Sequence, residues 1–170
     1  MLQSRFARGS WLPRVPSLDV VIYVDGSSVP NPGPSGFGLL VLARGGGTDW
    51  LFGHVKNVGI GGNNQAEFLG LVEACELVRG VRPRGALILS DSTVGLRLAT
   101  GTIRAGSSHT RQLQQRTASW LRQEPTVSLC WVPRSRNLAH HLAREAANLP
   151  AGTEATSRLG QHSRFLARAS

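Results

Sequence analysis

Three carboxylate side chains stand at sequence positions where a carboxylate could do chemistry. Asp25 follows Val20–Val24, a run of β-branched and aromatic residues that is typical of a strand buried on both faces. Asp91 follows a second apolar run, Ala86–Leu89, and Glu67 lies near the start of an expected helix. An Asp at the end of a buried strand is unfavourable unless a partner compensates its charge. The alternatives are that Asp25 caps a turn and that Glu67 faces water and complements its helix dipole.

The chemistry of these groups depends on where the strands lie. If the strands before Asp25 and Asp91 are parallel neighbours, they lie about 4.8 Å apart, and their carboxyl ends share the edge where open α/β sheets bind ligands. Glu67 would join them from a helix packed on the sheet. Three carboxylates this close raise one another's pKa unless a cation is present, and oxygen ligands suit Mg²⁺ or Mn²⁺. Two such ions can hold an attacking water and a leaving oxygen in line across a phosphodiester.

The composition indicates a polyanionic partner. The 170 residues include 19 Lys and Arg against 10 Asp and Glu, a formal net charge of +9. Nucleic acid is the commonest partner of such a chain, and the alternative is an arginine-rich composition without a ligand. No apolar run approaches the length of a membrane span, so we expect no membrane association. Cys75 and Cys130 have no metal-ligand spacing, and we interpret both as reduced core residues of a cytoplasmic protein.

The elements that must position the carboxylates follow from the apolar pattern. Five runs bounded by turn residues predict strands, over residues 19–24, 36–44, 50–58, 86–89 and 127–132. One helix is expected after Asn64, with Gly80 as its C-terminal cap, and a second over residues 93–99, with Ser92 as its N-cap. Two more helices are expected over residues 111–122 and 137–148. Short connections make the first three strands an antiparallel meander, and β-α-β crossovers follow. We therefore predict an α/β fold with a mixed five-stranded sheet and helices on both faces.

The chain divides into three expected parts. Residues 1–17 contain three arginines and no acidic residue, and we interpret them as a flexible basic arm; the alternative is an organelle transit peptide. Residues 18–149 form a single catalytic domain. Residues 150–170 are rich in Ala, Ser, Thr and Arg, and we interpret them as a basic tail that could carry a short helix around Phe165.

Four segments together resemble the type 1 ribonuclease H family over roughly Asp19 to Asn148: DGSSVPNPGPSGFG, GNNQAE, LSDS and LAREAAN. The resemblance implies the strand order 3-2-1-4-5 with strand 2 antiparallel. It implies an endoribonuclease that hydrolyses the RNA strand of RNA–DNA hybrids by a two-metal-ion mechanism and leaves 5′-phosphate and 3′-hydroxyl ends. Asp25, Glu67 and Asp91 match the metal-binding Asp, Glu and Asp of the family.

The resemblance also implies where a hybrid binds. The family residues that match Asn63 and Asn64 contact the minor groove and ribose 2′-hydroxyls, and an amide can both donate to and accept from a hydroxyl. The alternative for this pair is a helix cap and its loop, and Asn31 could contact phosphates or hold its own turn. We assign substrate binding to Gly26, Ser27, Asn31, Asn63, Asn64, Gln65 and Arg134. Nothing in the sequence indicates an obligate protein partner.

The sequence departs from the family pattern at the fourth acidic ligand. Leu142-Ala143 place His140 at that position, and a spacing one residue shorter after Asn137 makes His141 a second candidate. A neutral nitrogen ligand would favour Mn²⁺ over Mg²⁺. We therefore list His140 with the three carboxylates as a catalytic and metal-binding residue. The alternatives are partly exposed histidines with no metal role, and a weakly active or non-catalytic nucleic-acid-binding protein on the same fold.

Overall fold

The computed structural model describes Leu12 and residues 17–162. Its elements are β1 (Asp19–Ser28), β2 (Gly33–Gly45), β3 (Thr48–Gly61), α1 (Asn63–Val81), β4 (Gly85–Ser90), α2 (Thr93–Ala99), α3 (Ser108–Gln123), β5 (Val127–Trp131), the 3₁₀ turn η1 (Arg134–Arg136), α4 (His140–Asn148) and β6 (Glu154–His162). Most of the expected N-terminal arm, and the stretch around Phe165, lie outside the described residues. Within them, no helix is long and apolar enough to cross a membrane.

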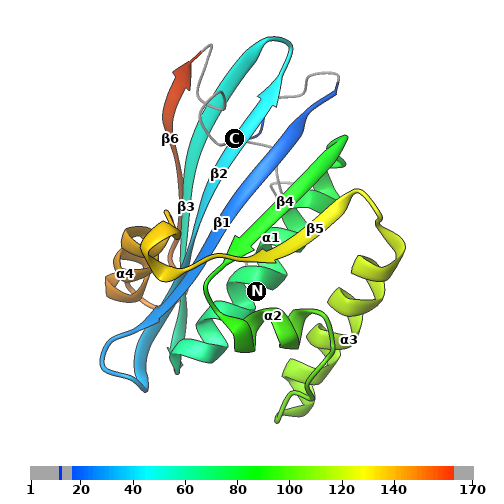
Figure 1. Cartoon of the computed structure of the whole chain (residues 1–170). Coiled ribbons are helices and arrows are strands. Elements are labelled where there is room, and N and C mark those ends of the chain that lie inside the picture. Colours follow the sequence, from blue (N-terminus) through cyan, green and yellow to red (C-terminus); the bar gives the residue numbers. More distant parts are fainter. Residues whose placement is uncertain (1–11, 13–16, 163–170) are drawn as a thin grey trace.

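The strands form one mixed sheet in the order β5-β4-β1-β2-β3-β6 (Figure 1). β2 is antiparallel to both β1 and β3, whereas β1, β4 and β5 run parallel to one another. The predicted mixed sheet and the order of its first five strands are therefore confirmed. The predicted number of strands is wrong, because a sixth strand extends the sheet beyond β3.

The sixth strand lies in the stretch that we expected to be a tail. β6 pairs antiparallel with β3 from Lys56↔Glu154 to Asp49↔His162. Side-chain contacts support the pairing, since Lys56 lies 3.1 Å from Glu154 and Nδ1 of His54 lies 2.8 Å from the Thr156 hydroxyl. Most side chains of β6 are exposed, so its sequence has no apolar alternation to reveal it. Backbone pairing with a neighbouring strand, rather than burial, makes this segment extended.

Helices cover both faces of the sheet, as predicted. α1, with α2 and α3 beside it, lies on one face, and α4 lies on the other (Figure 1). Alternate side chains of β1 point toward the two faces of the sheet. Val20, Ile22 and Val24 are buried in the main core with residues of α1, whereas Tyr23 packs against the second core with Leu142 of α4.

The helix boundaries differ from the predictions in three places, one of which is α3, which begins at Ser108, three residues earlier than predicted. α2 begins and ends as predicted, and the Ser92 hydroxyl accepts a hydrogen bond from the backbone N–H of Gly95 at 2.9 Å. Gly80 is inside α1 rather than at its cap, because the helix continues to Val81 and Arg82 takes the left-handed conformation. α4 begins at His140, three residues later than expected.

Cys130 is exposed, so its assignment to the core is also wrong, whereas Cys75 is buried.

A glycine on β2 allows α4 to lie close to the sheet. Gly38 is the cross-strand partner of Asp25. A Cβ atom at Gly38 would lie 2.4 Å from Cβ of Leu142 and 2.6 Å from the backbone nitrogen of Ala143. Real side chains do not tolerate such distances, so only glycine permits this approach. The contact brings the first turn of α4 over the end of β1.

We expect Gly38→Ala to destabilise the protein by about 1–3 kcal/mol, because the added methyl group overpacks the contact between β2 and α4. Urea unfolding followed by circular dichroism measures this change. Gly106→Ala is the matched control, since nothing lies within 4 Å of its Cβ position, and it should change stability by less than about 0.5 kcal/mol. Equal stability of the two variants would contradict the close packing of α4.

Candidate active site

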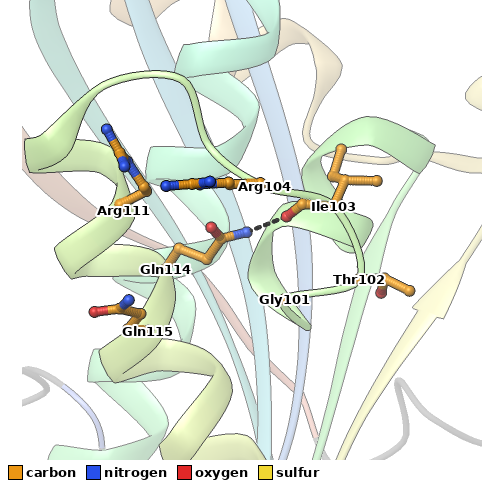
Figure 2. A pocket seen from close by; sticks show the side chains of 7 residues that line it. All are labelled: Gly101, Thr102, Ile103, Arg104, Arg111, Gln114 and Gln115. Atoms are coloured by element: carbon orange, nitrogen blue, oxygen red, sulfur yellow. Dashed lines mark hydrogen bonds between the residues drawn. The ribbon is translucent and has the colours of Figure 1, made fainter.

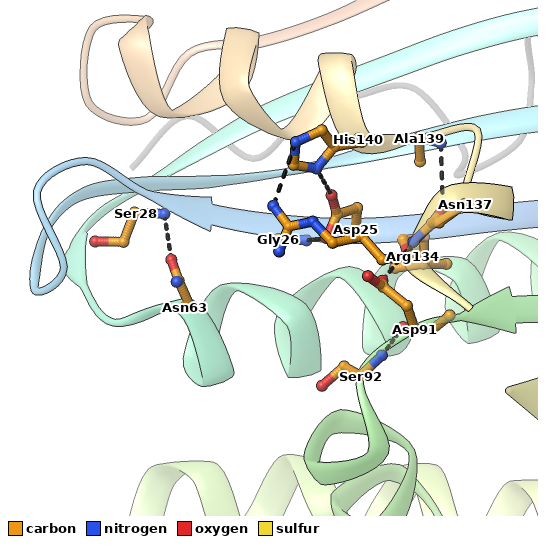
Figure 3. A network of polar contacts seen from close by, with 12 residues as sticks. Asp25, Gly26, Ser28, Asn63, Asp91, Ser92, Arg134, Asn137, Ala139 and His140 are labelled. Carbon is orange, nitrogen blue, oxygen red and sulfur yellow. Dashed lines mark hydrogen bonds and ion pairs between the residues drawn. The ribbon is translucent and has the colours of Figure 1, made fainter. Parts of the chain in front are cut away.

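Two aspartates meet where the parallel pairing of β1 and β4 ends. β1 pairs with β4 in a register that places Val24 beside Ser90, so the next residues, Asp25 and Asp91, lie at the same edge of the sheet. Figure 3 shows both side chains in one polar network at this edge. The geometry therefore brings together the two carboxylates that the apolar runs singled out.

Asp25 is buried and both of its carboxylate oxygens have partners. The residue is 5% exposed. Its Oδ1 accepts a hydrogen bond from the backbone N–H of Gly26 at 2.9 Å, and its Oδ2 lies 2.7 Å from Nδ1 of His140. Asp25 therefore points toward the face of the sheet that α4 covers.

Glu67 approaches the same edge from α1 on the opposite face. Its carboxylate accepts a hydrogen bond from the hydroxyl of Ser92, the N-cap of α2. Gly26 makes this position possible, since a Cβ atom there would lie 2.2 Å from the backbone nitrogen of Glu67. Gly26, which we predicted as a substrate contact, thus packs against the α1 backbone.

Asn137 holds Asp91, and the sequence reasoning did not select it as a site residue. Its side-chain amide donates to Oδ1 of Asp91 at 2.6 Å and to the backbone carbonyl of Val24 at 2.9 Å. Its oxygen accepts from the backbone N–H of Ala139 at 3.2 Å. The side chain is 6% exposed and connects the ends of β1 and β4 to the start of α4. In the sequence, an Asn shortly before a helix indicates only a helix cap. The contact with Asp91 spans 46 residues, so no local pattern indicated it.

His140 reaches the carboxylates, whereas His141 is exposed. His140 also lies 3.4 Å, through Nε2, from the Nη2 atom of Arg134 (Figure 3). The ring thus lies between a carboxylate and a guanidinium group, with Nδ1 facing Asp25 and Nε2 facing Arg134.

The carboxylates interact electrostatically with one another. Burial raises the pKa of Asp25 above its ordinary value, and the charge of Asp91 raises it further, while the hydrogen bond with His140 opposes the change. Burial is also the largest cause of the raised pKa of Glu67, and the charges of Asp25 and Asp91 add to it. The charge of Arg134 lowers the pKa of Glu67, which places Arg134 beside the cluster. A nearby cation would relieve this repulsion.

The donor set fits a divalent cation in its chemistry. Carboxylate oxygens from three parts of the chain suit Mg²⁺ or Mn²⁺, and a bound cation would favour the charged forms of Asp25 and Glu67, whose pKa values burial raises. In the described part of the chain, no group of three or more His, Cys, Asp or Glu side chains is already arranged to hold a metal ion. The carboxylates instead face separate partners: Asp25 faces His140, Glu67 faces Ser92 and Asp91 faces Asn137. Ion binding would require these side chains to turn toward a common point.

The other residues predicted to bind substrate gather where α1 begins. Asn63 accepts a hydrogen bond from the backbone N–H of Ser28 at 2.7 Å, and its own backbone N–H donates to Oδ1 of Asn31 at 3.2 Å. These bonds join the loop after β1 to the start of α1. Asn64 and Gln65 are exposed on the first turn of α1, and Ser27 is half-buried in β1. Asn31 and Asn63 thus have structural partners, while Asn64 and Gln65 are open to a ligand.

A family model described as RNase H matches residues 17–147. The "Bifunctional protein Rv2228c" of Mycobacterium tuberculosis strain H37Rv is 30% identical over 139 residues, which cover 81% of this chain but only 38% of that protein. The solved N-terminal RNase H domain of rv2228c, a fusion with maltose-binding protein, is similar with a TM-score of 0.62 and 28% identity, covering 77% of this chain and 94% of that chain. RNase H1 from the halophilic archaeon Halobacterium salinarum NRC-1 has a TM-score of 0.61 and 27% identity, covering 75% and 96%. LC11-RNase H1, solved in complex with an RNA/DNA hybrid, has a TM-score of 0.58 and 24% identity, covering 75% and 96%, and shows the shared fold.

We expect Asp25→Asn to stabilise the metal-free protein at pH 7. Because the pKa of Asp25 is higher in the folded state than in the unfolded state, this carboxyl favours folding at low pH, and that contribution is lost as the pH rises through the folded-state pKa. With chelator present, the amide should therefore raise the midpoint of thermal unfolding by about 2–4 °C for each kcal/mol gained in the free energy of unfolding. This gain should vanish near pH 4. Glu145→Gln, at an exposed position of α4, is the control and should not shift the midpoint. A lower midpoint for Asp25→Asn at pH 7 would contradict a raised pKa of Asp25 in the folded state.

We expect Asn137→Asp to destabilise the protein more at pH 7 than at pH 4. A carboxylate at position 137 would face Asp91 in place of the amide donor, which lies 2.6 Å from it. The loss of a buried hydrogen bond to a charged group costs about 1.5–3 kcal/mol, and repulsion between two ionised groups adds to it at neutral pH. Urea unfolding at both pH values measures the effect. Gln112→Glu, at an exposed position of α3, is the control, and a pH-independent effect of Asn137→Asp would argue against the contact with Asp91.

Proposed function

The chain belongs to the RNase H family, and we propose from this that it is an endoribonuclease that hydrolyses the RNA strand of RNA–DNA hybrids. The observation that carries the proposal is the meeting of Asp25, Glu67 and Asp91 from β1, α1 and the end of β4, with raised pKa values at Asp25 and Glu67. The chain spans about two fifths of the length of the curated mycobacterial relatives that it matches. The proposal therefore concerns the activity of this domain.

Asp25, Glu67, Asp91 and His140 would hold two divalent cations, Mg²⁺ or Mn²⁺. When bound, the cations would compensate the carboxylate charges, activate a water molecule and stabilise the leaving oxygen, which yields a 5′-phosphate and a 3′-hydroxyl. Before a cation binds, other groups of the chain hold the carboxylates, and binding would turn the side chains from these partners toward a common point. Asn137 fixes Asp91, and the N–H of Gly26 fixes one oxygen of Asp25.

His140 gives this site a neutral nitrogen where the family has a carboxylate. The imidazole contacts Asp25 through Nδ1, and its Nε2 lies beside Arg134. Nδ1 can bind a cation only if the contact with Asp25 breaks, and Nε2 only if the contact with Arg134 breaks. Imidazole binds Mn²⁺ more readily than Mg²⁺. We propose that Mn²⁺ supports faster cleavage than Mg²⁺ at equal concentration.

The hybrid would bind along the start of α1 and across the edge of the sheet. Asn64 and Gln65 are exposed there, and amide groups suit ribose hydroxyls. Asn63, Asn31 and the backbone around Ser27 shape this surface, and Arg134 adds a positive charge beside the carboxylates. The net charge of +9 favours a phosphate backbone as the partner.

A second candidate function is binding of nucleic acid with weak or no cleavage. The contact between His140 and Asp25 favours it, because this hydrogen bond engages one oxygen of a predicted metal ligand. The two candidates differ in one measurement. An end-labelled panel of RNA–DNA hybrid, duplex RNA and duplex DNA, with Mg²⁺ and Mn²⁺ in parallel, separates cleavage of the hybrid from binding alone.

We expect Asp91→Asn to lose nearly all hybrid cleavage while hybrid affinity is retained. The amide can still accept from Asn137, so the fold is preserved, but the negative charge that a cation requires is lost. Gel analysis of an end-labelled hybrid measures cleavage, and fluorescence anisotropy measures binding. Glu145→Gln serves as the control and should cleave like the unmodified protein. Cleavage by Asp91→Asn within about tenfold of the unmodified protein would refute the role of this carboxylate.

A further inference from the structure

The outer edge of β6 is open within the described residues. β6 is the last strand of the sheet and pairs with β3, while α1 and α4 pack over β1, β2 and β3 (Figure 1). The backbone groups along an open strand edge can pair with another strand, and proteins commonly protect such an edge with Pro, Lys or a bulge. Residues 154–158 contain no Pro or Lys, and the bulge of this ladder comes after Arg158. This stretch is therefore able to accept a further strand.

The hydrogen-bond register of β6 decides which of its residues face outward. The backbone N–H of Asn57 in β3 donates to the carbonyl of Thr153 at 2.9 Å, and residues 154–158 continue the same pairing. In an antiparallel ladder, the backbone groups of successive residues point alternately to the two sides. Residues 155 and 157 therefore face β3, as Thr153 does. The backbone groups that face outward belong to Glu154, Thr156 and Arg158.

These three outward residues are complementary to a second copy of themselves. When two β6 strands run antiparallel with Thr156 opposite Thr156, Glu154 of each strand lies opposite Arg158 of the other. All three pairs are then hydrogen-bonded pairs, in which the two residues exchange both backbone bonds. Opposite charges directly across an antiparallel pair stabilise it, and like charges destabilise it. Only this register places both charged residues opposite a partner of opposite sign.

The two charged side chains are open to such a partner. Arg158 is exposed, and within the described residues no carboxylate lies at ion-pair distance from it. Glu154 lies 3.1 Å from Lys56, yet its side chain remains 42% exposed. Lys56 also lies 3.8 Å from Glu73 of α1, so these contacts hold Glu154 on the face of the sheet that α1 covers. Arg158 is on the same face, because side chains of a strand alternate with a period of two.

We propose that two copies of this chain associate edge to edge through β6, about a two-fold axis at Thr156. The interface is isologous, with the same five residues, 154–158, contributed by each copy. The sheet then continues from one copy into the other in the order β3-β6-β6-β3.

The helices leave room for this arrangement. The axis is perpendicular to the sheet, so both α4 helices lie on one face of the continuous sheet and both α1 helices on the other. The two β2 strands, over which α4 packs, lie roughly 24 Å apart, about twice the diameter of a helix. The carboxylates at the end of β1 are three strands away from the interface. The proposal therefore does not depend on the proposed function.

Charge reversal combined with sedimentation velocity tests the interface. One strand pair is a small interface, so we expect the unmodified chain to form a weak dimer, with a Kd on the order of 100 µM. The measurement is made at physiological ionic strength, where the Debye length of about 8 Å screens the net charges of the two copies. Arg158→Glu and Glu154→Arg each place like charges opposite one another and should each weaken dimerisation about tenfold. An equimolar mixture of the two variants should regain the dimer, because every Glu at the interface then lies opposite an Arg.

Arg111→Glu is the matched control, because it makes the same charge change away from β6. Like Arg158, Arg111 has no carboxylate at ion-pair distance within the described residues. It lines a pocket with Arg104 and Gln114, between α3 and the loop that follows α2 (Figure 2). α3 lies toward the β5 edge of the sheet, opposite to β6 (Figure 1). This variant should dimerise like the unmodified chain.

A cysteine on the axis tests the register without a change of charge. In the proposed dimer the two Cα atoms at position 156 lie about 5.5 Å apart, which is within the range of a disulfide. Thr156→Cys, combined with Cys130→Ser, should therefore form a disulfide-linked dimer on mild oxidation. Gln123→Cys with Cys130→Ser, at an exposed position of α3, is the control and should give little of it.

Several results would overturn the proposal. An unmodified chain that sediments as a monomer up to about 1 mM would refute the dimer. Equal effects of Arg158→Glu and Arg111→Glu would show that only overall charge matters. A mixture of two folded variants that dimerises no better than either alone would refute the register. If circular dichroism shows that Glu154→Arg does not fold, the cysteine variants decide, and equal yields of linked dimer at positions 156 and 123 would refute the interface.

Discussion

The close approach of two helices to opposite faces of β1 and β2 is the constraint on which the site depends. Gly26 faces α1, where a Cβ atom would lie 2.2 Å from the backbone of Glu67, and Gly38 faces α4, where it would lie 2.4 Å from Leu142. Asp25 lies between these contacts, next to Gly26 in the chain and opposite Gly38 in the sheet. Gly26 therefore allows Glu67 to lie near Asp25, and Gly38 allows the start of α4, with His140, to lie near it.

This packing has an electrostatic consequence. Helices held this close bury Asp25 and Glu67, and burial raises the pKa of both carboxyls. The charge of Asp91, at the end of β4, raises both pKa values further. Ser92 and Asn137 donate hydrogen bonds to the carboxylates but add no positive charge, and His140 lies against one oxygen of Asp25. The metal-free cluster is therefore strained electrostatically, which is the condition under which a divalent cation binds strongly.

Sequence reasoning succeeded where a short stretch determines its own structure. The β-branched run before Asp25 forms a strand, and Ser92 caps a helix with the predicted ends, because both depend on neighbouring residues. It failed where a partner far along the chain decides. β6 is extended because β3 offers it an edge, and α4 begins at His140 because Asn137 bonds to Val24 and Asp91 instead of joining the helix.

The sequence by itself determined the candidate carboxylates, the antiparallel meander with its crossovers, and the basic character of the chain, since these follow from residue types and periodicity. The strand order came from the resemblance to the family. Only the tertiary structure decided that His140 rather than His141 reaches Asp25, across 115 residues of sequence. The tertiary structure likewise decided that Asn137 holds Asp91, and that Arg104 and Arg111 share one pocket. The physical reason is that each of these contacts is set by the distance at which a helix or loop packs on the sheet, and no local pattern encodes that distance.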